Sequence, residues 1–257
     1  MQVRAILFDI EGTLISCGKL IPGSLEAVQY ARTLGMEIRF LTNMTNRSSQ
    51  QIANELTDLG IVADALEVQT STSACLSLLK KRPGLRCHFM VPPSIVSVFD
   101  EIVRDDIAPD VLVIGDLAEG FNYAAMNKAF LILRAGAELI VFHKNLFWFD
   151  TTEAKLDSGA FVLALEAASN KKATITGKPS REFFETAIAG LRCNRDQVLI
   201  VGDDLNTDIA GGNLVNVRTV LVGTGKYADG QVKGIFKEDY FLESVRVLPD
   251  FLDRLNA

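Results

Sequence analysis

The sequence predicts an α/β protein built on a parallel sheet. Short apolar runs alternate with helical periodicity along the chain, which is typical of strand–helix–strand crossover units. The first apolar run leads directly into Phe8-Asp9-Ile10-Glu11-Gly12-Thr13. An apolar stretch that stops at two carboxylates and a glycine is typical of a buried strand, and in open α/β sheets ligands bind at the carboxyl ends of such strands.

Turn residues divide the chain into the expected elements. The first helix follows Pro22-Gly23 and ends at Gly35, and the second has Ser48 as its N-cap and Gly60 as its stop. Helices are expected at residues 24–34, 48–59, 73–81, 123–134, 160–169 and 181–191. Strands are expected at residues 3–10, 36–41, 87–91, 111–115, 138–143, 198–202 and 219–222.

Two polar, basic stretches are candidate domain joints. Residues 80–84 carry a Pro-Gly break, and residues 170–172 read Asn-Lys-Lys. The block between them is long enough for a small α/β domain inserted in a larger one. We therefore expect a core made of residues 1–81 and 173–257, with an inserted domain at 82–172.

Composition indicates an ordinary intracellular enzyme. The chain has 257 residues, 48% of them hydrophobic, so it can bury a large core. A net charge of -6 argues against a nucleic-acid-binding surface, which needs clustered Lys and Arg. No apolar run approaches the roughly 18 residues that span a bilayer. We therefore expect no membrane partner. The four cysteines show no CxxC spacing, so we expect free thiols and a cytoplasmic location.

Side-chain alternation along the first strand predicts that Asp9 and Glu11 point the same way while Ile10 packs inward. Two carboxylates in one crevice repel each other unless a cation or a shared proton is present. This pair therefore predicts a functional site at the end of the strand, with a bound cation or a shared proton.

Three further clusters follow predicted strands. They are Thr42-Asn43, Gly177-Lys178-Pro179, and Gly202-Asp203-Asp204 with Asp208. Each alone is typical of a turn or a helix start, but at the carboxyl ends of parallel strands they would converge. Carboxylates suit Mg²⁺, a lysine suits phosphoryl oxygens, and a carboxylate can act as a nucleophile that forms an aspartyl-phosphate.

Other phosphate and metal motifs do not fit. A P-loop needs Ser or Thr after its lysine, but Lys178 is followed by Pro179 and Lys226 by Tyr227. The stretch from Gly223 imitates a dinucleotide-binding loop without an amphipathic helix after it. Residues 204–208 imitate the first half of a calcium loop but lack its glycine and its final glutamate.

These motifs resemble those of the haloacid-dehalogenase-like (HAD) phosphohydrolases. The likeness rests on Asp9-x-Glu11-Gly12-Thr13, Thr42, Lys178 and Gly202-Asp203-x-x-x-x-Asp208, and Gly225-Lys226-Tyr227 is among the supporting stretches. It covers essentially the whole chain. The resemblance implies a Rossmann-like core and a cap domain inserted after Thr42-Asn43. Within the superfamily, the chain looks most similar to the phospholysine phosphohistidine inorganic pyrophosphate phosphatase group.

The resemblance also implies roles for single residues. Asp9 would be the nucleophile and a Mg²⁺ ligand, and Asp203 would complete the metal site. Glu11 would give its backbone carbonyl to the metal and act as general acid and base. The remaining roles are phosphoryl binding by Thr42, Asn43 and Lys178, and support of metal-bound water by Asp208. Asp204 matches a variable position and receives no role.

Glu11 departs from the family pattern, which usually has Asp at this position. The extra methylene displaces the carboxyl by about 1.5 Å, and misplacement on that scale can cost about 10²-fold in rate. The expected function is a Mg²⁺-dependent phosphatase that uses an aspartyl-phosphate. The alternatives are a phosphotransferase with an acceptor other than water, and a catalytically weak HAD-fold binding protein.

The sequence predicts the class of substrate and the kinds of partner but does not name the substrate. We expect a small phosphorylated metabolite, no nucleic acid and, because relatives commonly pair through the cap, a homodimer through the cap. The segment at residues 142–150 falls near the place where related caps carry a specificity loop. We expect this segment to form a buried strand and apolar corner, and the alternative hypothesis is that Lys144 and its neighbours contact the leaving group.

Overall fold

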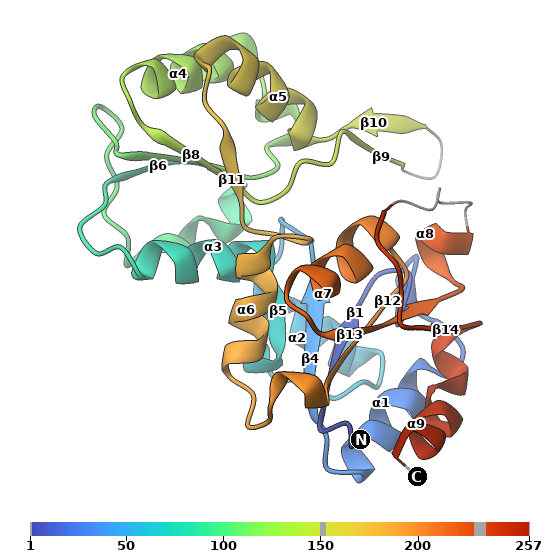
Figure 1. The fold of residues 1–257 in the computed structure, drawn as a ribbon. Helices are drawn as coiled ribbons and strands as arrows, with labels where there is room; N and C mark the ends of the chain where they lie inside the picture. The colour runs from blue at the N-terminus through green and yellow to red at the C-terminus, as the bar shows by residue number, and fades with distance from the viewer. Residues whose placement is uncertain (1, 150–152, 229–234, 257) are drawn as a thin grey trace. The chain divides into compact units, whose positions relative to one another are not determined.

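The computed structural model describes residues 2–149, 153–228 and 235–256. The chain divides into two compact units (Figure 1). The core unit comprises Met1–Thr42, Ser49–Gln69 and Lys178–Ala257, and the inserted unit comprises Asn43–Ser48 and Thr70–Gly177. Each unit is built on its own sheet, so each is described by itself.

A six-stranded sheet forms the core unit, in the order β14-β13-β12-β1-β4-β5. Its strands are β1 (Ala5–Asp9), β4 (Glu37–Thr42), β5 (Val68–Thr70), β12 (Val198–Gly202), β13 (Arg218–Val222) and β14 (Tyr240–Leu242). Strand β1 pairs in parallel with both β4 and β12. Every residue of β1 and β12 is buried, as expected for strands covered on both faces.

The strand order reverses beside β1. The chain runs outward from β1 through β4 on one side, and from β12 through β13 and β14 on the other. Ligands of open α/β sheets bind at such a switch point, beyond the carboxyl ends of the strands. Because Phe8 pairs with Val201, Asp9 lies level with Gly202, and Asp203 comes next along the chain. The register alone therefore brings two predicted site residues to the switch point.

Helices connect the strands of the core unit. They are α1 (Ser24–Thr33), α2 (Ser49–Asp58), α6 (Arg181–Ala189), α7 (Ala210–Leu214), α8 (Gly225–Ala228) and α9 (Leu248–Asn256). Helix α1 packs against α9, and α6 packs against α7. A short antiparallel hairpin, β2 (Ile15–Ser16) and β3 (Lys19–Leu20), follows β1 directly.

The inserted unit carries a four-stranded parallel sheet in the order β11-β8-β7-β6. Its elements are α3 (Ser71–Lys80), β6 (Cys87–Met90), β7 (Val111–Ile114), α4 (Tyr123–Arg134), β8 (Glu138–Val141), β9 (Phe147–Phe149), β10 (Ala154–Leu156), α5 (Ser158–Ser169) and β11 (Ala173–Ile175). Strands β9 and β10 form a separate hairpin.

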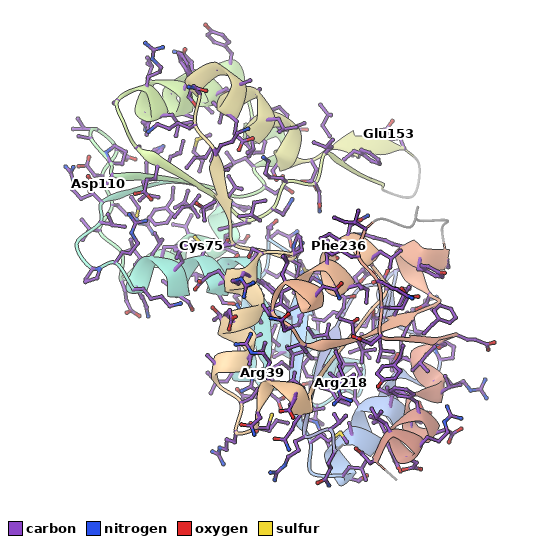
Figure 2. All side chains as sticks on the ribbon, in the orientation of Figure 1. Arg39, Cys75, Asp110, Glu153, Arg218 and Phe236 are labelled. Atoms are coloured by element: carbon purple, nitrogen blue, oxygen red, sulfur yellow. The ribbon has the colours of Figure 1, made fainter. Side chains whose placement is uncertain are left out.

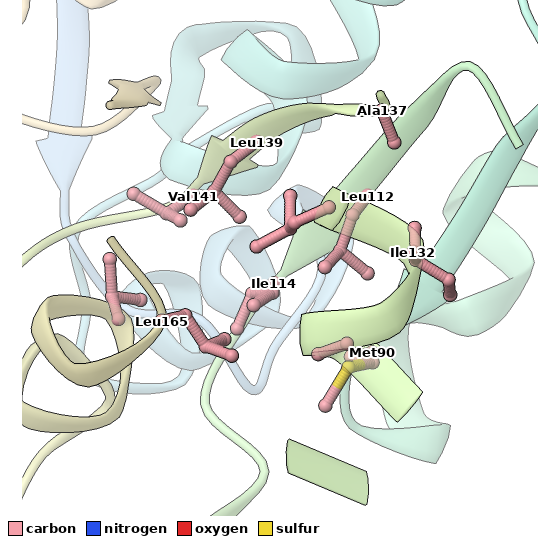
Figure 3. Close-up of a cluster of buried hydrophobic side chains, with 11 residues drawn as sticks. Met90, Leu112, Ile114, Ile132, Ala137, Leu139, Val141 and Leu165 are labelled. Atoms are coloured by element: carbon pink, nitrogen blue, oxygen red, sulfur yellow. The ribbon is translucent and has the colours of Figure 1, made fainter. Parts of the chain in front are cut away.

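Alternation along β7 and β8 gives this sheet two apolar faces. Leu112 and Ile114 of β7 face a cluster with side chains of α4 and α5 (Figure 3). Val111 and Val113 belong to a second cluster, which contains Cys75 of α3 (Figure 2). The unit is therefore a three-layer sandwich with its own core.

The α/β class with a parallel-sheet core is confirmed, but the units divide at different residues from the expected joints. The divisions fall at 42–43, 48–49, 69–70 and 177–178, whereas the expected joints lay at 81–82 and 172–173. Helix α3 belongs to the inserted unit because Cys75 and Leu79 pack into that unit's second apolar cluster. Short elements such as β11 and the two hairpins show too little periodicity for sequence patterns to reveal.

The part of the chain that the structure describes contains no helix long and apolar enough to cross a membrane.

Candidate active site

Asp9 ends strand β1 and is buried, with 5% of its surface exposed. One of its oxygens, Oδ1, accepts a hydrogen bond from the ammonium group of Lys178. Its other oxygen, Oδ2, is buried, and no donor among the described residues hydrogen-bonds to it. A buried carboxylate oxygen without a donor is costly, so a cation or a proton is needed at this position.

Lys178 lies between two carboxylates. Its Nζ also donates to Oδ1 of Asp208 at 2.7 Å, and all three side chains are buried. Burial alone would lower the pKa of Lys178, but attraction by Asp208 and Asp9 raises it above its usual range. The lysine is therefore a fixed positive charge at the switch point.

Asp9, Asp203 and Asp208 form a buried acid cluster. Each offers a carboxylate oxygen, and these oxygens lie within 4.8 Å of one another. The pKa of Asp9 is raised to about 7, because the effect of burial is larger than the lowering effect of the Lys178 charge. Burial, together with repulsion from Asp208, raises the pKa of Asp203 to about 6, and burial raises that of Asp208 to about 7. An all-oxygen cluster that includes an unbonded oxygen fits a hard divalent cation.

The carboxylate of Asp203 is held from two sides. Its Oδ2 accepts the backbone N–H of Lys226 at 2.6 Å, and its Oδ1 accepts the hydroxyl of Thr13 at 3.5 Å. Gly12 lies against it with φ +90°, and a Cβ at this position would come within 2.3 Å of Asp203 Oδ2. Only glycine allows the loop after β1 to approach the cluster this closely.

The helical turn after β12 orients Asp208. Residues Leu205–Ile209 form a single wide helical turn. Asp204 caps it by accepting the N–H of Asn206 at 2.8 Å, and its own N–H donates to Asp208 Oδ2 at 3.2 Å. Asp204, which received no role from sequence, is thus the residue that shapes this turn.

Glu11 does not follow the predicted alternation. Strand β1 ends at Asp9, so the two-residue period that aimed both carboxylates alike does not extend to position 11. The side chain of Glu11 is exposed, and its Oε1 accepts the N–H of Cys17 at 3.2 Å, at the tip of the β2–β3 hairpin. Asp9 and Glu11 therefore have different surroundings: Asp9 belongs to the acid cluster, whereas Glu11 is hydrogen-bonded to the β2–β3 hairpin.

Of the other predicted residues, Thr42 and Asn43 flank one division of the chain between the units, and Lys144 lies within the inserted unit. Thr42 is buried at the end of β4, the neighbour of β1. Asn43 belongs to the inserted unit, where its Oδ1 accepts the hydroxyl of Ser71 at 3.1 Å. Lys144 donates to buried Glu166 at 2.6 Å, and its contact with a leaving group stays a hypothesis. Asp150 lies outside the described residues.

Sequence reasoning missed the contribution of the segment after β13. Thr224 donates its hydroxyl to the carbonyl of Gly12 at 2.6 Å, and the ammonium of Lys226 donates to Asp204 Oδ2 at 2.8 Å. The only sequence signal for this segment was the supporting stretch Gly225-Lys226-Tyr227.

Solved phosphatases share this fold. The 4-nitrophenylphosphatase from Thermotoga maritima superposes with a TM-score of 0.87 at 24% identity, over 96% of this chain and 97% of that chain. A double mutant of the thermostable NPPase from Geobacillus stearothermophilus gives a TM-score of 0.86 at 25% identity, over 95% and 97%. The fold of this chain is thus shared with solved phosphatases.

Sequence comparison assigns the family. A profile described as haloacid dehalogenase-like hydrolase matches residues 6–102, and one described as HAD-hydrolase-like matches residues 175–248. The phospholysine phosphohistidine inorganic pyrophosphate phosphatase of Xenopus laevis is 36% identical over 238 residues, 90% of this chain and 87% of the relative. The human haloacid dehalogenase-like hydrolase domain-containing protein 2 is 36% identical over 225 residues, 88% and 86%. The chain belongs to the haloacid dehalogenase-like hydrolase family and is a phosphohydrolase.

The raised pKa values in the acid cluster predict how the stability of the metal-free protein depends on pH. The folded state holds these protons more tightly than the unfolded state, where the ordinary value is 3.8. The resulting stabilisation is complete below that value and is lost as pH rises through about 7. The melting temperature measured in chelator should therefore fall between about pH 5 and about pH 8.

Adding MgCl₂ should raise the melting temperature more at the higher pH, where the carboxylates are ionised. In the Asp9→Asn variant the fall with pH should be smaller, because one titrating group is gone. A melting temperature in chelator that rose over this pH range equally in both proteins would contradict the prediction.

Proposed function

We propose that this protein is a Mg²⁺-dependent phosphatase that hydrolyses a small phosphorylated substrate through an aspartyl-phosphate on Asp9. The observation that carries the proposal is the surroundings of Asp9: a buried carboxylate with one oxygen bonded to Lys178 and the other without a donor, inside a cluster of acids. Asp203, Asp9 and the carbonyl of Glu11 are the proposed metal ligands, with Asp208 in a supporting role. Bound there, Mg²⁺ would offset the negative charge of the carboxylates and of the phosphoryl group.

In the first proposed step, a carboxylate oxygen of Asp9 attacks phosphorus. The new O–P bond forms as the bond to the leaving oxygen breaks, and Glu11 donates a proton to that oxygen. Lys178 reduces the repulsion between the attacking carboxylate and the anionic substrate, because its ammonium group already contacts Asp9.

In the second step, water attacks the phosphorus of the aspartyl-phosphate. Glu11, now a carboxylate, takes a proton from that water, and inorganic phosphate leaves with Asp9 restored. Thr42 and Asn43 are proposed to hold the phosphoryl oxygens through both steps. The carboxyl of Glu11 must leave the Cys17 N–H, or share it, to reach the substrate.

The choice of substrate class rests on relatives. The names of the similar proteins refer to phospholysine, phosphohistidine and inorganic pyrophosphate, and we propose these first, with sugar phosphates and nucleotides as comparators. The fold does not choose among them, because all present the same phosphoryl group. The cytoplasmic location, the homodimer and the absence of nucleic-acid and membrane partners stay predictions.

One observation favours a catalytically weak protein as the second candidate. Glu11 has one methylene more than the usual Asp, and its carboxylate is bound to the β2–β3 hairpin. A slow hydrolase that retains the metal site would combine both features. A phosphotransferase would use the same first step, and product analysis with added alcohols or nucleosides as acceptors separates it from a hydrolase.

Replacing the nucleophile tests the proposal. Asp9→Asn should lower turnover of 4-nitrophenyl phosphate by at least about 10³-fold, because an amide oxygen cannot form the intermediate. Asp58→Asn, at an exposed acid on α2, is the matched control and should leave turnover unchanged. Acid-quenched wild-type protein incubated with labelled substrate should carry phosphate on Asp9. Equal turnover of wild type and Asp9→Asn would refute the enzyme mechanism.

Shortening the acid at position 11 tests the geometric argument. Glu11→Asp should raise turnover, by up to about 10²-fold, because it restores the usual reach of the acid and removes its tie to Cys17. Glu11→Gln can still accept the Cys17 N–H but cannot donate the proton, so it should be slower than wild type. If Glu11→Asp brings no gain on any phosphate ester tested, the methylene is not what limits the reaction.

A further inference from the structure

The segment that follows β13 and begins α8 makes three hydrogen bonds, one to the acid cluster and two to residues beside it in the sequence. Thr224 Oγ1 donates to the carbonyl of Gly12, the N–H of Lys226 donates to Asp203 Oδ2, and the ammonium of Lys226 donates to Asp204 Oδ2. These donor–acceptor distances are 2.6, 2.6 and 2.8 Å, and every residue belongs to the core unit. One short segment therefore ties the loop after β1 to the turn after β12.

Close packing shows that this contact is specific. Gly225 has φ +55°, and a Cβ there would lie 2.1 Å from Asp203 Oδ2 and 2.6 Å from the Cα of Gly12. A side chain at this position would displace the carboxylate proposed to bind the metal. Glycine lets the backbone of the loop press directly on Asp203.

Lys226 pairs with a carboxylate that burial would otherwise penalise. Asp204 is 4% exposed, whereas 61% of the Lys226 side chain is exposed. An exposed lysine contributes little through its own pairing, but removing a charged partner of a buried carboxylate is unfavourable. The carboxylate of Asp204 would then rotate toward water, and the turn that begins at Asp204 would change.

That turn connects Lys226 to the proposed metal ligands. Asp204 is the immediate neighbour of Asp203, and its N–H donates to Asp208 Oδ2. Asp208 in turn binds Lys178, which binds Asp9. A shift at Asp204 is thus passed to the acid cluster through adjacent atoms.

We propose that Lys226 is a positioning residue for the metal site: it holds Asp204, and with it Asp203 and Asp208, in the geometry that binds a divalent cation. This inference rests on the proposed metal-dependent function and extends it to a residue outside the four motifs. Its ammonium group acts through Asp204 rather than on the substrate.

The two effects of removing the lysine charge have opposite signs. Loss of a positive charge would strengthen cation binding by Coulomb attraction, whereas loss of the Asp204 contact would weaken it by misplacing ligands. Because the lysine is largely exposed, solvent screens the first effect. Loss of partners around metal ligands typically weakens metal affinity by about 10–100-fold, so the net change should be weaker binding.

The test is calorimetric titration of MgCl₂ into the full chain, a readout independent of turnover. Lys226→Met should raise the dissociation constant about 10–100-fold. Lys226→Arg, which can still donate to the carboxylate, should stay within a few-fold of wild type. Lys237→Met, at an exposed lysine of the same unit, is the matched control and should bind as wild type does.

A double variant distinguishes positioning from a general charge effect. If Lys226 acts by pairing with Asp204, the Lys226→Met/Asp204→Asn protein should recover most of the lost affinity, because no buried charge is left unpaired. Wild-type affinity in Lys226→Met, or a double variant as weak as Lys226→Met, would overturn the inference. Absence of Mg²⁺ binding in the wild type would instead refute the proposed function, and this inference with it.

Discussion

The buried ammonium group of Lys178, held between Asp9 and Asp208, is the interaction on which the site depends. Carboxylates removed from water must be paired or neutralised. Four buried acids, Asp9, Asp203, Asp204 and Asp208, lie in this region, and the ammonium groups of two lysines, Lys178 and Lys226, form ion pairs with three of them. When all are ionised, two negative charges remain, which equals the charge of one divalent cation. The charge balance of the protein itself therefore supports the proposed cofactor.

Topology explains how so many charges meet at one place. The sheet reverses its strand order between β1 and β12. Because these two strands are parallel neighbours, their carboxyl ends lie beside each other. Asp9 ends the first strand and Asp203 follows the second. Lys178 is the first residue of the core unit after the inserted unit, and its ammonium group pairs with Asp9 at the end of β1 and with Asp208.

The sequence was most informative where a side chain sits at the end of a strand. Asp9 and Asp203 could be placed because apolar runs and parallel pairing determine where strands end. The direction of the Glu11 side chain could not be predicted, because β1 ends at Asp9 and the conformation of the loop that follows depends on Gly12 and the hairpin. Lys226 was missed because α8, which holds it, is only four residues long and shows no periodic pattern, and because its partners lie in another loop of the sequence. The joints between the units were misplaced because α3 follows a core strand but packs on the inserted sheet.

The acid cluster is proposed to bind a divalent cation. Calorimetric titration with MgCl₂ at about pH 6.5, repeated in buffers of different ionisation enthalpy, counts the protons released on binding. Because burial raises the pKa of both Asp9 and Asp208 to about 7, binding should release protons at this pH. The release should vanish near about pH 8.5, where the acids are already ionised. No binding, or binding without proton release at the lower pH, would contradict the account.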